Sequence, residues 1–396
     1  MRLPLVLILP VLVLNALVDW YICRAVARRC TCGRRFWQPF SVWSSVALAI
    51  ALIVLICLPK RSGGDAELLS IMWVLYAYFS IYVPKYLYVI IDLIGKIPCL
   101  FGWRRIKGFG VSGMVVAAGT FGLMWWGALV NRFNLDVNRV DVEIPGLPAS
   151  LDGFTIAQIS DMHVGSYGTD TTFVAKLVRT VNDLHPDLIV FTGDVVNRHT
   201  SEIEPFRAVL SGLHAPEGVL SVLGNHDYGD YYMWPDDSAK MADRRLLHTI
   251  QADMGWRLLN NETAEIVRPD GKLAVIGVEN IGDPPFPIYG NLDEAYPGDL
   301  ADDVPKILLS HNPMHWVNDI KDSPDKNIAL TLSGHTHAMQ IAFGRVSPAV
   351  FRYPTWGGMY TDEDGHSLYV NIGTGEVGIP TRIGATPEIT LFTLRK

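Results

Sequence analysis

Five short polar clusters in the second half of the sequence carry side chains that bind divalent metal ions. Each cluster follows a short apolar run, and in chain order they are Asp161-Met162-His163, Gly193-Asp194, Gly224-Asn225-His226-Asp227, His311 and Gly334-His335-Thr336-His337. The donors are carboxylates, an amide and imidazoles without a thiolate, which suits Mn²⁺, Fe or Zn²⁺ better than a cysteine-bound structural zinc. Because seven such ligands exceed the need of one ion, the pattern predicts two ions that share a carboxylate. Two ions about 4 Å apart activate a water and stabilise phosphoryl displacement.

The clusters can meet only if the apolar runs before them are neighbouring strands. The pattern of apolar residues and turn residues predicts strands over 154–160, 187–192, 219–223, 307–310, 328–333, 367–372 and 388–394, helices over 171–184, 204–213 and 236–254, and a hairpin of 263–268 with 272–279. Alternating strands and helices followed by paired strands predict an α/β fold of packed sheets with helices outside. Ligands of such sheets collect beyond the carboxyl ends of the strands, so the five clusters are expected in one cleft.

Local spacing supports the same cleft. Side chains two residues apart on an extended segment point the same way, which directs Asp161 and His163 together, and likewise His335 and His337. The glycines that precede Asp194, Asn225 and His335 allow sharp turns and close backbone approach.

The ordered motifs DxH, GD, GNHD, H and GHTH resemble the calcineurin-like metallophosphoesterase superfamily over about Phe154 to His337. The C-terminal stretch PEITLFTL and an apolar N-terminal half are similar to bacterial membrane-associated members, some of which hydrolyse UDP-2,3-diacylglucosamine in lipid A synthesis. This resemblance implies a four-layer sandwich of two packed mixed sheets flanked by helices. One departure is that Ala338-Met339 follows GHTH where a pair of glycines is frequent, which reshapes the pocket edge but removes no ligand.

The resemblance also implies a role for each polar residue. Three residues would hold one metal ion: Asp161, His163 and His337. Three others would hold the second ion: Asn225, His311 and His335. Asp194 would bridge the two ions. His226 would stabilise transition-state charge or protonate the leaving oxygen, oriented by Asp227.

The charges of the chain divide it into two unlike parts. Residues 1–134 hold 14 Lys and Arg against 4 Asp and Glu, whereas residues 135–396 hold 19 against 36. We therefore expect a transmembrane region over 1–134 and a catalytic domain over 135–396. The acidic second part argues against nucleic-acid binding, because phosphate backbones select positive surfaces.

Four apolar runs approach the roughly 20 residues that a membrane-spanning helix needs. They cover residues 3–22, 42–58, 68–91 and 111–130. The third is the weakest because Pro84 and Lys85 interrupt it, and we expect it to be kinked or partly interfacial. All five cysteines lie in the first 99 residues, and we interpret Cys23, Cys30 and Cys32 as incidental loop thiols rather than a metal site.

Basic residues predict the orientation of these spans. The loops after the first and third spans hold nine Lys and Arg, whereas the loop between the second and third holds two. Basic short loops stay in the cytoplasm. The chain is therefore predicted to be a multi-pass plasma (inner) membrane protein with its catalytic domain outside the cytoplasm.

The predicted activity is metal-dependent hydrolysis of a phosphodiester, phosphomonoester or pyrophosphate, with a lipid-linked ester among the candidate substrates. Two divalent ions are expected as cofactors, Mn²⁺ first, with Fe or Zn²⁺ as alternatives. One alternative is an enzyme like UDP-2,3-diacylglucosamine pyrophosphatase. An alternative of another class is a non-catalytic membrane scaffold. The glycine-rich segment 373–378 matches a dinucleotide-binding pattern, but Pro380 blocks the helix that would follow, so we interpret it as a turn.

Overall fold

The computed structural model describes residues 5–29, 34–58, 62–284, 287–296, 304–321 and 328–396, and it divides into two compact units, Met1–Ala128 and Leu129–Lys396. Each unit is described separately below.

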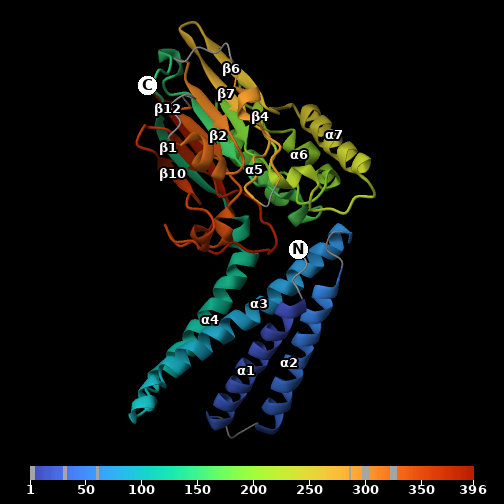
Figure 1. Ribbon diagram of the computed structural model, residues 1–396, viewed down its shortest axis with the longest axis vertical. Coiled ribbons are helices and arrows are strands. Elements are labelled where there is room, and N and C mark those ends of the chain that lie inside the picture. The colour runs from blue at the N-terminus through green and yellow to red at the C-terminus, as the bar shows by residue number, and fades with distance from the viewer. Residues whose placement is uncertain (1–4, 30–33, 59–61, 285–286, 297–303, 322–327) are drawn as a thin grey trace. The chain divides into compact units, whose positions relative to one another are not determined.

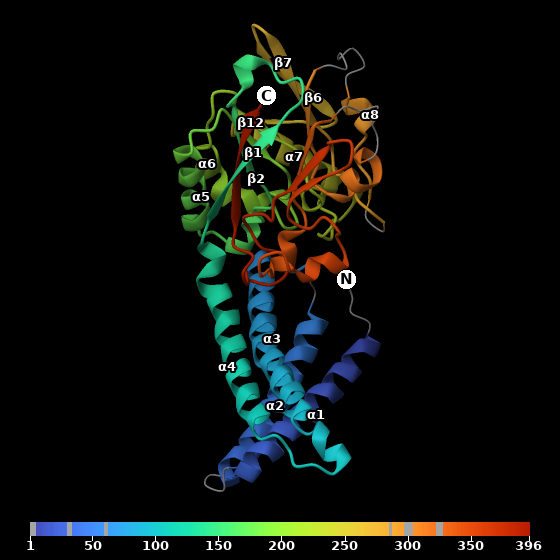
Figure 2. The same cartoon turned by 90° about the vertical axis from the view of Figure 1, so that its left-hand side faces the viewer.

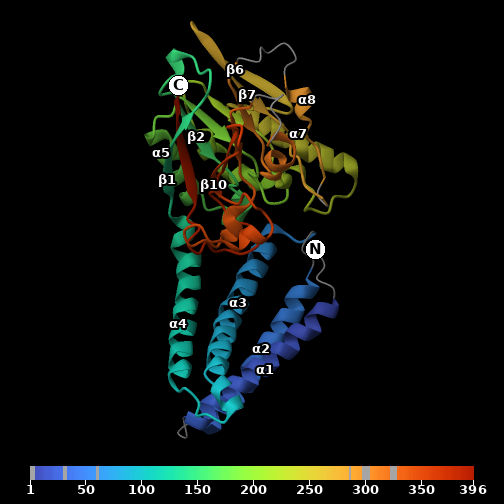
Figure 3. The same ribbon diagram turned by 60° about the vertical axis from the view of Figure 1, so that its left-hand side comes forward.

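The first unit is built from four long helices. They are α1 (Leu5–Arg29), α2 (Arg34–Cys57), α3 (Asp65–Ile94) and α4 (Gly108–Leu129). All four are long and apolar enough to cross a membrane, which agrees with the expected transmembrane region of four apolar helices. Figure 3 shows two antiparallel pairs, α1 with α2 and α3 with α4, in which α1 and α3 end at the same end of the bundle. The basic residues predicted to mark two loops therefore follow helices that end on one side.

Helix α3 continues through the Pro84-Lys85 segment that weakened its prediction. The Lys85 ammonium lies 2.7 Å from the Asp19 carboxylate of α1, and the Tyr82 hydroxyl donates to the same carboxylate at 2.9 Å. Ionisable side chains inside a membrane are costly unless they pair, and these two pair with each other. The third span is therefore a complete helix, which contributes a charged residue to the interior of the bundle.

The thiols of this unit form no disulfide within the described residues. Cys23, Cys57 and Cys99 are free. The expectation that Cys23 lies in a loop is wrong, because it belongs to helix α1, and the same expectation for Cys30 and Cys32 lies outside the described residues.

The second unit contains two six-stranded mixed sheets. The first sheet has the order β1-β12-β2-β3-β4-β5 and the second has the order β10-β11-β9-β8-β7-β6. The strands of the first sheet are β1 (Asp136–Glu143), β12 (Glu388–Arg395), β2 (Thr155–Ile159), β3 (Leu188–Phe191), β4 (Val219–Ser221) and β5 (Trp256–Leu258). Those of the second are β10 (Gly358–Thr361), β11 (Ser367–Val370), β9 (Leu330–Ser333), β8 (Lys306–Leu309), β7 (Gly271–Gly277) and β6 (Glu262–Arg268).

Helices cover the outer faces of the two sheets. They are α5 (Thr172–Asp183), α6 (Arg207–Leu210), α7 (Asp237–Asp253) and the short α8 (Leu292–Ala295). Figure 1 shows α5, α6 and α7 together on one side of the strands, and Figure 2 shows α8 on the side away from α5 and α6. The predicted sandwich of two mixed sheets flanked by helices is confirmed.

The hydrophobic core lies between the sheets and under the helices. In β3, Leu188 and Val190 face the inter-sheet core, whereas Ile189 and Phe191 face the core under the helices. Successive side chains of a strand point to opposite faces, and a strand that is covered on both faces is apolar throughout. This explains why the central strands appeared as continuous apolar runs in the sequence. Their neighbours β2 and β4 pair with β3 in parallel, so all three strands deliver their following loops to one edge.

Candidate metal centre

The seven predicted ligands lie together in the second unit, in the loops that follow β2, β3, β4, β8 and β9. Six of them are at most 9% exposed, and His335 is partly buried. Five have positive backbone φ angles: Asp161, His163, Asp194, His335 and His337. Positive φ is unfavourable for residues other than glycine and clusters at functional sites. The backbone turns sharply at each strand end, which directs these side chains to a common centre.

Two glycines make this crowding possible. Gly193 has φ +99°, and a Cβ atom there would lie 2.5 Å from the Gly224 nitrogen. A Cβ atom on Gly334 would lie 2.2 Å from an Asp161 carboxylate oxygen. Only residues without a side chain allow these loops to approach so closely.

The first group of ligand atoms comes from Asp161, His163 and His337. The two histidine Nε2 atoms lie 3.1 Å apart, and His337 Nε2 lies 3.3 Å from the Asp161 Oδ1 atom. Burial lowers the pKa of His163 to about 3 and holds the pKa of His337 well below its usual value. Both rings are therefore neutral, and each offers a lone pair to a cation.

The second group comes from Asn225, His311 and His335. His311 Nε2 lies 3.1 Å from Asn225 Oδ1 and 3.2 Å from His335 Nδ1. The other ring nitrogen of His311 donates to the Thr192 carbonyl oxygen at 2.8 Å, which fixes the ring orientation and leaves Nε2 to face the group.

Asp194 lies between the two groups. Its Oδ2 atom is 3.2 Å from His311 Nε2 and 3.6 Å from His163 Nε2. Although burial opposes ionisation, the imidazoles of His311 and His226 hold the pKa of Asp194 well below its usual value. Burial likewise opposes the charged form of His311, but the Asp194 carboxylate raises the pKa of His311 to about 9.

The donor set fits two divalent cations. Buried carboxylate oxygens and imidazole nitrogens converge within 4.8 Å of one another in overlapping groups. Such groups are costly to bury together unless hydrogen bonds or metal ions satisfy them. No sulfur belongs to these groups, as the sequence predicted.

His226 lies beside the centre with a partner that differs from the predicted one. Its Nδ1 atom is 2.6 Å from the Asn197 carbonyl oxygen. The Asp227 carboxylate instead accepts hydrogen bonds from the backbone N–H groups of Asp194, Val195, Val196 and Gly224 at 2.8–3.2 Å. The expectation that Asp227 orients the His226 side chain is therefore wrong, because four N–H donors already occupy the carboxylate.

Two tyrosines that the sequence analysis did not identify contact the second group of ligands. The Tyr353 hydroxyl lies 2.9 Å from His335 Nε2. The Tyr231 hydroxyl accepts from Asn225 Nδ2 at 2.8 Å, and its ring stacks on His226 with centroids 4.2 Å apart. Because Asn225 donates its amide N–H to Tyr231, its Oδ1 atom faces the metal centre. Both tyrosines lie in loops outside the five polar motifs, and no regular spacing in the sequence relates them to the metal ligands.

On the far side of the first group, the buried Arg382 guanidinium lies 3.2 Å from His337 Nδ1. Arg382 also donates to the carbonyl oxygens of Gly375 and Ala385. The segment 373–378 forms bends rather than the start of a helix, so its interpretation as a turn is confirmed.

These features define an α/β phosphoesterase of the type that binds two metal ions, preceded by a membrane unit. The family model described as calcineurin-like phosphoesterase matches residues 154–339, and the model described as the probable transmembrane domain of a calcineurin-like phosphoesterase matches residues 1–132. The chain belongs to the calcineurin-like metallophosphoesterase family, as its motifs predicted.

Three relatives illustrate the range of similar proteins. An uncharacterized metallophosphoesterase of Bacillus subtilis is 30% identical over 304 residues, which cover 73% of this chain and 96% of that protein. A transmembrane protein with metallophosphoesterase domain from Danio rerio is 33% identical over 65% of this chain and 57% of that protein. The UDP-2,3-diacylglucosamine pyrophosphatase LpxG of Chlamydia trachomatis is 27% identical over 68% of this chain and 92% of that protein.

We predict different effects from removing the shared ligand and from removing His226. Asp194→Ala should abolish hydrolysis and lower the metal content, because both groups lose their common carboxylate. His226→Ala should keep its metal but slow turnover by roughly 10²–10⁴-fold, the usual range for loss of a general acid. Metal analysis of the purified full chain, together with rates per bound ion, measures both effects. The exposed Asp183→Ala provides the control and should match the wild type. Loss of metal from the His226 variant with full rate per ion would reject its role.

The tyrosine hydroxyls should tune metal affinity. Removal of such an outer partner typically costs 10–100-fold in affinity or activity, so Tyr353→Phe should weaken Mn²⁺ binding by about that factor. Calorimetric titration of the metal-free protein provides the measurement. Tyr232→Phe, which removes a hydroxyl of the same loop as Tyr231 without a bond to a ligand residue, is the control. Equal Mn²⁺ affinity of all three proteins would show that Tyr353 does not position His335.

Proposed function

We propose that the chain is a membrane-anchored hydrolase of phosphate esters that uses two divalent metal ions. The observation that carries this proposal is the position of Asp194, whose carboxylate lies between two groups of buried ligand atoms. In this assignment Asp161, His163 and His337 would hold one ion. Asn225, His311 and His335 would hold the other ion, and Asp194 would serve both.

Two divalent ions held by these residues would activate a water and neutralise charge on the phosphate, as in other two-metal sites. The residues of the chain orient the reaction. The Asn197 carbonyl accepts a hydrogen bond from His226 Nδ1, so Nε2 is the nitrogen available to a leaving oxygen. Asp227 holds the backbone of the loops that carry Asp194 and Gly224.

We propose Mn²⁺ as the resident metal, with Fe or Zn²⁺ as alternatives. Oxygen and imidazole donors without thiolate support this choice. The buried, neutral histidines of the first group supply nitrogen ligands that need no deprotonation at neutral pH.

We propose an amphiphilic, lipid-linked phosphate ester as the substrate class. Four candidate spans are more than tethering requires, and they keep the catalytic unit near a lipid surface. The similar protein of Chlamydia trachomatis is named for a diacylated sugar nucleotide. A non-catalytic scaffold is the contrasting class, but all seven ligand positions are retained, and they converge in the structure.

The location we propose is the plasma (inner) membrane, with the catalytic unit outside the cytoplasm. The basic loops after α1 and after α3 support this orientation. This orientation conflicts with the alternative that the enzyme hydrolyses UDP-2,3-diacylglucosamine, because the resemblance implies that lipid A precursors carrying UDP are made in the cytoplasm. The two proposals therefore compete, and sidedness decides between them.

The catalytic proposal predicts metal-dependent hydrolysis with a lipid preference. The full chain with Mn²⁺ should cleave an activated phosphodiester or phosphomonoester, and it should favour lipid phosphates over water-soluble ones. A screen of both kinds of ester with the full chain and with the soluble fragment 135–396 measures the preference. Two bound ions without activity on any phosphate ester would support the scaffold. Equal preference for soluble esters by both proteins would refute the lipid substrate while leaving the hydrolase intact.

The proposed position of the catalytic unit outside the cytoplasm predicts how reporters fused after Lys396 behave. Alkaline phosphatase should be active at this position and green fluorescent protein should be dark, because the catalytic unit lies outside the cytoplasm. Fusions after Cys57, at the end of α2, are the matched control, since an even number of spans precedes both positions. The opposite pattern at Lys396 would place the unit in the cytoplasm and favour the UDP-diacylglucosamine alternative.

A further inference from the structure

Three basic side chains surround a cavity between α1 and α3 in the first unit. The cavity has a volume of about 290 Å³ and is lined by Trp20, Tyr21, Arg24, Ala25, Asp92, Lys96 and Arg105. Arg24 belongs to the last turns of α1, and Lys96 and Arg105 belong to the connection between α3 and α4. All three therefore lie near the end of the bundle at which α1 and α3 terminate (Figure 3). In a spanning bundle this end reaches the lipid headgroups.

The cations of this cavity exceed its anions. Asp92 is its acidic residue, and this buried carboxylate already binds the Tyr21 hydroxyl and the Arg105 guanidinium and lies 3.4 Å from the Lys96 ammonium. A single carboxylate balances one positive charge, so the lining keeps a net charge of +2. This excess charge selects an anion.

One of the cations retains unused hydrogen-bonding capacity. Among the described residues, the exposed Arg24 guanidinium contacts the Trp20 ring, 4.6 Å from its centroid, and forms no ion pair. A guanidinium that no carboxylate neutralises binds a phosphate oxygen by charge-assisted hydrogen bonds.

An apolar groove adjoins the cavity along α1. It is lined by Val13, Ala16, Leu17 and Trp20, so Trp20 belongs to both hollows. These residues have the i, i+3, i+4, i+7 spacing of a single helix face, which runs about 10 Å from the basic end toward the middle of the span. The combined site thus presents cations at headgroup depth and a hydrocarbon surface beside them.

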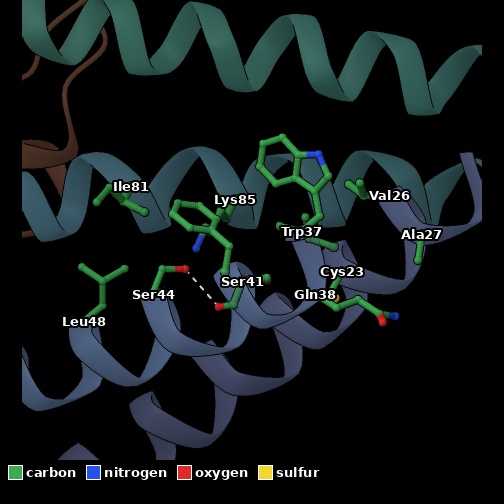
Figure 4. Close-up of a pocket in the computed structure, with 12 residues that line it drawn as sticks. Cys23, Val26, Ala27, Trp37, Gln38, Ser41, Ser44, Leu48, Ile81 and Lys85 are labelled. Carbon is green, nitrogen blue, oxygen red and sulfur yellow. Dashed lines mark hydrogen bonds between the residues drawn. The ribbon is translucent and has the colours of Figure 1, made fainter. Parts of the chain in front are cut away.

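A larger cavity on the neighbouring side of α1 lacks this charge excess. Figure 4 shows its lining, which includes Trp37, Ser41 and Ser44 of α2 and Lys85 of α3. Its volume is about 360 Å³, but the Lys85 ammonium is neutralised by Asp19 at 2.7 Å. Charge therefore distinguishes the smaller cavity as the anion site.

We propose that this α1–α3 site binds an anionic phospholipid, with the phosphate against Arg24, Lys96 and Arg105 and an acyl chain along Val13–Trp20. A cavity of about 290 Å³ has room for a phosphate headgroup, since far less volume already holds a water molecule. Basic pockets between spanning helices are a recognised location for acidic lipid headgroups. The site is separate from the metal centre and binds a lipid of the surrounding membrane.

Native mass spectrometry of the full chain in detergent tests the headgroup contact. Dioleoyl phosphatidylglycerol should bind about tenfold more tightly than dioleoyl phosphatidylcholine. Arg24→Gln should weaken phosphatidylglycerol binding about fivefold, the effect of one basic residue near a charged lipid, and should leave phosphatidylcholine unchanged. Arg104→Gln is the matched control, because Arg104 is exposed beside Arg105 but does not line the cavity. Equal binding of the two lipids, or equal losses in both arginine variants, would overturn the proposal.

A second pair of variants tests the acyl-chain contact. Ala16→Phe should fill the groove and weaken phosphatidylglycerol binding, whereas Val11→Phe, at an exposed position outside the groove, should not. Unchanged unfolding temperatures would show that the bundle remains intact. Glycerol 3-phosphate should compete poorly with the lipid. If it competes as well as phosphatidylglycerol at equal concentration, the site binds a free phosphate ester, and the lipid assignment is wrong.

Discussion

The metal centre depends on the buried carboxylate of Asp227, which binds no metal ligand side chain. It accepts hydrogen bonds from three consecutive backbone N–H groups after β3 and from the Gly224 N–H after β4. Burial raises the pKa of Asp227 to about 7, although the backbone N–H bonds of Gly224 and Val196 oppose this shift. Together the four hydrogen bonds connect two loops that secondary structure does not pair. The turn that gives Asp194 its positive φ is held by this carboxylate. The position of the bridging ligand is therefore set by the backbone.

This rigidity is required because the centre is electrostatically crowded. Burial raises the pKa of Asp161 to about 6, whereas burial and the charged His311 lower the pKa of His335 to about 3. Each group alone would be more stable in water, and their convergence is maintained by the sheets and by contacts such as Thr192 with His311. Such a preformed set of ligands binds cations without paying for reorganisation, and the cations in turn stabilise the fold that presents them.

The sequence predicted the strands and ligands that neighbouring residues along the chain determine. Strands β2, β3 and β4 are covered on both faces, so their apolar runs are visible, and the ligands that follow them are polar residues at abrupt transitions. Strand β1 was missed because it is an edge strand with the mixed sequence DVNRVDVE, whose exposed positions carry no periodic signal. Tyr353 and Arg382 were missed for another reason. Both reach the centre from loops whose path depends on tertiary packing, and the same holds for the carbonyl of Asn197 that replaces Asp227 as the partner of His226.

In the membrane unit, polar side chains on one helix are paired with polar side chains on another, except at the basic end of the bundle. Inside the bundle, Asp19 binds Lys85 and Tyr82, and Asn15 binds Tyr78 and Tyr86, so polar groups of α1 are satisfied by α3. This polar seam specifies which helices are neighbours, a task that apolar side chains perform poorly when lipid is equally apolar. At the basic end the matching stops, because Asp92 cannot balance the cations around it. An excess of positive charge is tolerated there because lipid phosphates are available outside the protein, so the surrounding membrane supplies the counter-charge that the chain itself lacks.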